Sequence, residues 1–102
     1  MRTTAIAQGD LVQVCSAEVG SGVRAVVITP GAYNARSRYV LVALVAGKSH
    51  EHPFEVSVGT QNVVLADYVY PLRTEQVQVV GRVQAAVLQD VLAKLEALLF
   101  ER

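Results

Sequence analysis

The sequence of 102 residues has one cysteine, Cys15, and no tryptophan. A single cysteine excludes an intrachain disulfide and is usual in a reducing compartment, which predicts a cytoplasmic protein. Cys15 falls late in an expected strand without signs of an activated environment, so we interpret it as a packing residue.

Long apolar runs are also absent. The longest, such as YVLVALVA at residues 39–46, fall short of the roughly 20 residues that a transmembrane helix needs. The N-terminal segment MRTTAIAQGD has a single arginine and no extended apolar core, so we expect no signal peptide.

Charge is scarce, with 18% charged residues and a formal net charge of zero. The overall charge therefore does not predict nucleic-acid binding. Its distribution is uneven, because residues 19–50 contain basic side chains and no acid. The basic residues are Arg24, Arg36, Arg38 and Lys48. This excess could follow a phosphate backbone, and solvated loop charges explain it equally well.

The sequence lacks a Walker loop, a nucleophile elbow and a dinucleotide-binding fingerprint. His50 and His52 flank Glu51 and could bind a divalent ion, but no third histidine or suitably spaced cysteine completes a ligand set. We therefore predict no metal and no cofactor. A histidine acting as a general base is the alternative for this loop.

Apolar residues are abundant, at 52% of the chain, which exceeds what a small monomer needs for its core. A chain of this length forms one domain, over residues 1–102, so a site must lie in a loop, on an edge or between subunits. The apolar excess predicts a homo-oligomer.

Alternating apolar and polar residues predict a mainly β fold. LVQV at residues 11–14 and RAVVITP at 24–30 should form a hairpin around a glycine turn. YVLVALVA, apolar on both faces, should be the central and most buried strand. PGAYN and ARSR, over residues 30–38, should be a turn and a loop. Further strands are expected at residues 54–58, 63–70 and 77–80.

From Gln84 the apolar residues repeat with helical spacing, which predicts an amphipathic C-terminal helix packed on the sheet. The repeating residues are Leu88, Val91, Leu92, Leu95, Leu98 and Leu99. No Ser, Thr, Asp or Asn stands immediately before this helix, so its N-cap is poor. The expected architecture is a small, strongly curved antiparallel barrel, similar to an SH3-like barrel.

Four strings, GDLVQV, HPFEVSV, VVLADYV and GRVQAAVLQDVLAKLEALL, resemble in order and spacing the MazF/PemK (Kid) family of toxin endoribonucleases. The resemblance spans residues 8–99. It implies a MazF/CcdB-like fold and a metal-independent endoribonuclease that cuts single-stranded RNA as the toxin of a type II toxin–antitoxin system. It also implies a MazE-like antitoxin partner and a homodimer whose groove receives RNA and antitoxin.

The family string RPAVVLSP, whose arginine is catalytic, corresponds here to VRAVVITP. Val23 then occupies the arginine position, and Arg24 lies one residue later. A shift of one residue on a strand turns a side chain to the opposite face. Arg24 remains the implied catalytic cation, with an exposed arginine at a strand end as the alternative. Tyr33 and Asn34 match the family's Y-N, which we interpret as a turn signature.

The family usually has a Thr or Ser after the central strand that helps to position the scissile phosphate. Here Ala46 stands at that position, followed by Gly47. Ser49 is the candidate replacement for the missing hydroxyl. Lys48 and Arg36 are candidate phosphate contacts, and a solvated loop lysine is the alternative for Lys48.

The string Ala66–Asp67–Tyr68 corresponds to the CDQ or ADQ of some family members. RNA cleavage through the 2′-hydroxyl needs a base, a cation beside the phosphorane and an acid for the leaving oxygen. Asp67 and Arg24 could supply a minimal pair, and a structural acid bonding backbone amides is the alternative. Tyr68 replaces the usual Gln and could stack on a base.

Two other functions compete with the endoribonuclease. Ala46 and the displaced Arg24 favour a catalytically weakened family member that binds RNA or antitoxin without efficient cleavage. A gyrase-poisoning toxin of the related CcdB fold ranks last, since that family has a tryptophan in its C-terminal tail and this chain ends in Phe-Glu-Arg.

Overall fold

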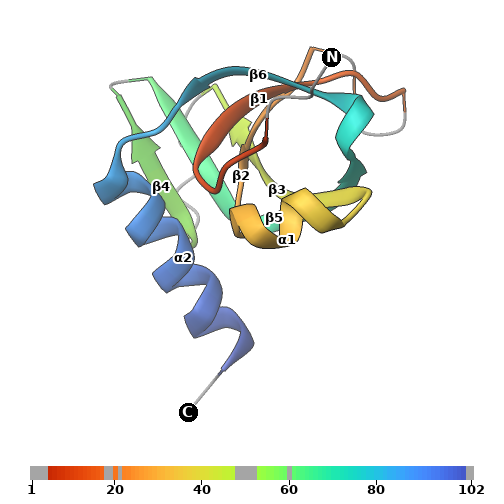
Figure 1. Ribbon diagram of the computed structural model, residues 1–102. Helices are drawn as coiled ribbons and strands as arrows, with labels where there is room; N and C mark the ends of the chain where they lie inside the picture. Colours follow the sequence, from red (N-terminus) through yellow and green to blue (C-terminus); the bar gives the residue numbers. More distant parts are fainter. Residues whose placement is uncertain (1–4, 18–19, 21, 48–52, 60, 101–102) are drawn as a thin grey trace.

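A computed structural model describes residues 5–17, 20, 22–47, 53–59 and 61–100. The strands in these residues form one antiparallel sheet in the order β4-β5-β3-β2-β1-β6, which curls into an open, barrel-like shape (Figure 1). The elements are β1 (Asp10–Val14), β2 (Arg24–Val27), α1 (Gly31–Arg36), β3 (Tyr39–Ala46), β4 (Glu55–Val58), β5 (Asn62–Arg73), the 3-10 turn η1 (Thr74–Gln76), β6 (Val77–Arg82) and α2 (Ala85–Leu99). The predicted curved sheet with a C-terminal helix is confirmed.

The sheet buries apolar side chains on both of its faces. Val26 and Ala43 belong to a core cluster on the face that α2 covers. Ala25, Val27 and Val42 belong to a second cluster on the opposite face, inside the curl. Successive residues of a strand project from opposite faces. β2 contributes to both clusters, and this requires consecutive apolar residues, as in Ala25, Val26 and Val27.

β3 is the central strand, as predicted, but it is not the most buried segment. β3 pairs with both β2 and β5, as a central strand must. In the described residues, the longest run of consecutive buried residues is 25–29, which begins in β2 and continues two residues past its end. β3 is only half-buried at Leu41 and over residues 44–46. Leu41, Leu44 and Val45 pack against the two core clusters but stay partly exposed, so an uninterrupted run of apolar residues does not by itself give a fully buried strand.

Helix α2 packs on the sheet through one face, as its helical spacing predicts. Val91 is fully buried in the first core cluster, and the partly buried Val87, Leu88, Leu92 and Leu95 pack beside it. Gln84 occupies the N-cap and makes no side-chain capping bond. Among the helices of the described residues, none has the length and apolarity required to cross a membrane.

Residues 31–36 form the short helix α1 and not the expected turn and loop. Asn34 is buried, and its side-chain amide hydrogen-bonds to two other parts of the chain. Its Oδ1 accepts a hydrogen bond from Thr29 Oγ1 at 2.6 Å, and its Nδ2 donates to the carbonyl of Ile6 at 2.9 Å and to that of Thr29 at 3.0 Å. The signature Y-N therefore marks a helix that ties two separate chain segments together.

The end of β6 and the exposure of Cys15 also differ from expectation. β6 runs to Arg82, two residues past the predicted end at Val80, and Arg82 Nη1 donates to Asp10 Oδ1 at 3.1 Å. Cys15 is exposed, so its interpretation as a packing residue is wrong. Val14 and Ser16 on either side are buried, and alternation therefore turns the thiol outward.

We predict that Asn34→Ala lowers the free energy of unfolding by about 1 to 3 kcal/mol, because it leaves buried polar partners unsatisfied. Urea unfolding would measure the change. The exposed Asn62 provides a matched control, and Asn62→Ala should change stability by less than about 0.5 kcal/mol. Equal effects of the two substitutions would contradict the structural role assigned to Asn34.

Candidate functional site

Arg24 is the first residue of β2 and is exposed. It pairs with Gln13 of β1, and Gln13 pairs on its other side with Gln78 of β6. Directly paired residues of an antiparallel sheet project from the same face. The sheet therefore displays a row of one cation and two amides, Arg24–Gln13–Gln78, next to the buried row of Ala25 and Val12.

The register of β2 explains the shifted position of Arg24. Val23 is partly buried and packs against the second core cluster, whereas Arg24 shares the face of Val26. The position that corresponds to the family's arginine is thus occupied by an inward apolar side chain. The available cation lies one residue later and projects from the other face of the sheet.

Asp67 and Tyr68 lie in β5 at an interruption of its pairing with β3. Ala43 pairs with Val69 and Val45 pairs with Val64, so residues 65–68 all lie opposite Leu44. Irregularities of this kind redirect side chains and are frequent beside functional sites. Asp67 is half-buried with its Oδ1 atom withdrawn from solvent, whereas Tyr68 is 46% exposed. Residues 67–70 line a pocket of about 350 Å³.

Arg24 and Asp67 come from strands that both pair with β3 (Figure 1). Two strand spacings put their backbones roughly 10 Å apart. Ala25 pairs with Leu44, which faces the irregular part of β5, so the two candidates lie on neighbouring rows. The fold thus brings a cation and a carboxylate, 43 positions apart in the sequence (67 minus 24), into one region.

The other predicted site residues are distributed differently. Ala46 ends β3, is half-buried and pairs with Val63. Lys48 and Ser49 lie outside the described residues, as does the histidine loop at 50–52. Arg36 is the last residue of α1, which follows the end of β2 opposite to Arg24. The structure therefore does not bring Arg36 together with Arg24.

Gln13 and Gln78 are candidate site residues that the sequence reasoning did not select. Each is the polar residue in an otherwise apolar strand string, LVQV and VQVV. That alternation predicts an outward position, but only the pairing register shows that Gln13 lies next to Arg24 and that Gln78 follows Gln13 in the same row. An amide both donates and accepts hydrogen bonds, as the edges of nucleobases do.

Comparison with known proteins finds matches over almost the whole chain. The PemK-like, MazF-like toxins of type II toxin–antitoxin systems match residues 5–99. The structure of MazF from Deinococcus radiodurans is similar at 30% identity and a TM-score of 0.80, over 95% of this chain and 98% of that one. A MazE–MazF structure from the same organism is similar at 29% identity and a TM-score of 0.82, over 95% and 97% of the two chains.

A more distant structure supports the fold alone. An endoribonuclease from mycobacterial species, solved in complex with its cognate antitoxin, has 20% identity and a TM-score of 0.82, over 93% of this chain and 95% of that chain. The comparison with curated proteins finds no significant match.

Proposed function

The chain belongs to the PemK-like, MazF-like family of type II toxin–antitoxin toxins, and on this premise we propose that it is an endoribonuclease acting on single-stranded RNA. The observation that carries the proposal is the exposed Arg24 in one row with Gln13 and, beyond it, Gln78, on a sheet of this family's fold. In this proposal the cation meets a phosphate and the amides contact neighbouring groups of the RNA.

The proposed reaction is attack of a 2′-hydroxyl on the adjacent phosphate, without a metal ion. Asp67 is proposed to accept the 2′-hydroxyl proton, and Arg24 to stabilise the negative charge that develops on the phosphorane. The phosphorus–oxygen bond to the 5′-oxygen breaks, and that oxygen takes up a proton from water, while the proton held by Asp67 returns to water. The products are a 2′,3′-cyclic phosphate and a 5′-hydroxyl. Tyr68, Lys48, Ser49 and Arg36 are proposed RNA contacts.

The proposed regulator is a MazE-like antitoxin. The similar protein from Deinococcus radiodurans is seen in a MazE–MazF structure, and the present sheet and helix match that toxin over nearly the full length of both chains. We propose that antitoxin and RNA use overlapping surfaces of this chain.

The alternative function is binding of RNA or antitoxin without efficient cleavage. Ala46 favours it, because its methyl group cannot donate the hydrogen bond that a hydroxyl would give to a phosphate oxygen. Incubation of the purified protein with a long unstructured RNA in EDTA, followed by mapping of product ends, distinguishes the two functions. Cyclic phosphate ends support the endoribonuclease, and intact RNA that remains bound supports the alternative.

We predict that Arg24→Ala lowers the rate of RNA cleavage at least about a hundredfold, since the loss of a group that stabilises developing charge costs roughly 3 kcal/mol. Arg38→Ala, at another exposed arginine, is the matched control and should cleave at nearly the normal rate. If Arg24→Ala cleaves normally, another cation performs the chemistry.

We predict that Ala46→Thr raises the cleavage rate about ten- to a hundredfold. A new hydrogen bond to a charged phosphate is worth roughly 1.5 to 3 kcal/mol, and threonine is well accommodated in a strand. Ala46→Val adds the same branched shape without the hydroxyl and should leave the rate unchanged. A folded Thr variant no faster than the Val variant would show that Ala46 does not face the phosphate.

We predict a homodimer. The described sheet has edges at β4 and β6, and exposed edges favour association. Apolar side chains are exposed on β6 and at the end of α2, namely Val79, Val80, Leu98, Leu99 and Phe100. Light scattering at micromolar concentration should give the mass of two chains, and the mass of one chain would contradict the prediction.

A further inference from the structure

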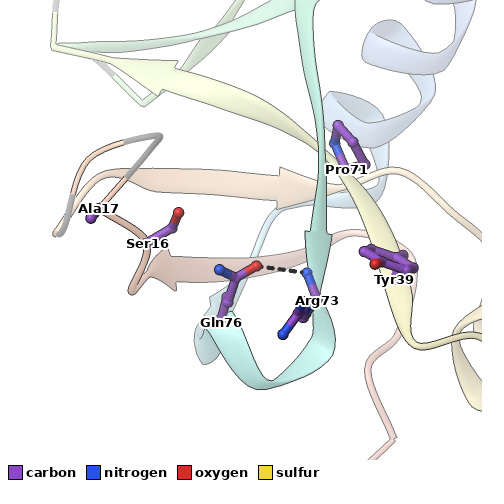
Figure 2. A pocket seen from close by; sticks show the side chains of 6 residues that line it. All are labelled: Ser16, Ala17, Tyr39, Pro71, Arg73 and Gln76. Carbon is purple, nitrogen blue, oxygen red and sulfur yellow. Dashed lines mark hydrogen bonds between the residues drawn. The ribbon is translucent and has the colours of Figure 1, made fainter.

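A second cavity, of about 430 Å³, lies where β5 passes through η1 into β6 (Figure 2). Four segments of the chain contribute to it: the end of β1, the start of β3, the end of β5 and η1. The lining residues are Ser16, Ala17, Tyr39, Pro71, Arg73 and Gln76. None of them was a candidate in the sequence analysis.

Pairing between β3 and β5 places an aromatic ring and a cation on the same side of the sheet. Tyr39 pairs directly with Arg73, so both side chains project from one face. The tyrosine is 46% exposed and the arginine side chain is 60% exposed. Both groups are therefore accessible to a ligand that enters the cavity.

The orientation of Gln76 is fixed by the backbone. Its Oε1 atom accepts a hydrogen bond from the backbone N–H of Arg73 at 2.9 Å, which identifies the other amide atom as the Nε2 donor. Figure 2 shows this nitrogen directed away from Arg73, toward the side of the cavity where Ser16 lies. The cavity thus combines an aromatic face, a cation and an oriented amide donor.

Glu75 is the acidic group beside this cation. Its Oε2 atom lies 3.7 Å from Arg73 Nη1, and its side chain is 73% exposed. An ion pair this long and this exposed contributes little, so an anionic ligand can replace the carboxylate at the guanidinium. The same carboxylate should nevertheless weaken the binding of an anion.

We propose that this cavity binds one nucleotide of a single-stranded RNA, with the base stacked on Tyr39, a phosphate on Arg73 and the base edge hydrogen-bonded to Gln76. Stacking on exposed aromatic rings next to cations is the general means by which proteins hold single strands. The volume lies within the range of small-ligand sites. The proposal rests on the proposed function and adds an RNA subsite to it.

The position of the cavity relative to Arg24 agrees with this assignment. Cys15 N–H donates to the Gln76 carbonyl at 2.7 Å, which joins the end of β1 to the cavity. Two residues earlier, Gln13 pairs with Arg24. Two strand spacings across the sheet, roughly 10 Å, and two residues along β1, roughly 7 Å, separate the candidate cation from η1. Ala25, next to Arg24, pairs with Leu44, which lies five residues, roughly 17 Å, along β3 from Tyr39. An RNA strand bound at Arg24 therefore reaches the cavity over several nucleotides.

The test measures the affinity of the full chain for a fluorescein-labelled, mixed-sequence 2′-O-methyl decanucleotide, which cannot be cleaved through the 2′ position. Tyr39→Leu should weaken binding about tenfold through loss of stacking, whereas Tyr39→Phe keeps the ring and should bind within about twofold of the original protein. Tyr33→Leu, at a similarly exposed tyrosine of α1, is the matched control and should have no effect.

Two charge variants test the cavity independently of Tyr39. Arg73→Gln should weaken binding and reduce the slope of log affinity against log salt by about one, as expected for one lost phosphate contact. Lys94→Gln on α2 removes a positive charge elsewhere and should leave that slope unchanged. Glu75→Gln should bind the oligonucleotide more tightly, because the competing carboxylate is gone.

The outcomes separate the subsite from the proposed function. If the original protein binds the oligonucleotide and the Tyr39, Arg73 and Glu75 variants bind it equally well, the subsite is overturned and the endoribonuclease proposal stands. If the original protein neither binds this oligonucleotide nor cleaves RNA, both proposals fail. Should Tyr39→Leu fail to fold, unchanged binding by Arg73→Gln and Glu75→Gln would still overturn the subsite.

Discussion

Burial of β2 and the middle of β3 on both faces is the constraint on which the rest of the structure depends. Ala25 and Val26 enter opposite core clusters although they are adjacent in the chain. Polar groups are therefore excluded from the middle of these strands and collect where strands begin, end or lose their regular pairing. Arg24 and Asp67 occupy two such places, and Ala46 ends β3 at a third, which is why the candidate site lies at this margin of the core.

Because charged residues are few, the affinity for RNA should depend strongly on where each cation lies. With no net charge, long-range attraction contributes little to RNA binding, and affinity must come from local contacts. The structure provides two regions suited to such contacts, the row Arg24–Gln13–Gln78 and the cavity of Tyr39, Arg73 and Gln76. The two regions are several residues apart along the strands, so an RNA strand that contacts both must extend over several nucleotides.

Polar hydrogen bonds also fix the chain at the ends of strands, away from these two regions. Asn34 connects α1 to the chain near Ile6 and Thr29. The Asp10 carboxylate accepts hydrogen bonds from the Ala7 backbone at 2.8 Å and from Arg82 at 3.1 Å. Such bonds stabilise positions where the two apolar clusters no longer specify the path of the chain.

The strands, the C-terminal helix and the family could be predicted from the sequence, because alternation, helical spacing and the order of short strings are local properties of the chain. The sequence did not determine α1, where Asn34 finds partners outside its own segment, or the outward position of Cys15. The pairing of distant strands places Arg24 on the opposite face from Val23 and in one row with Gln13 and Gln78. The tertiary structure also created the cavity from four separate segments. The physical reason is that faces and neighbours follow from pairing register and from the curvature of the sheet, and both depend on contacts between residues far apart in the chain.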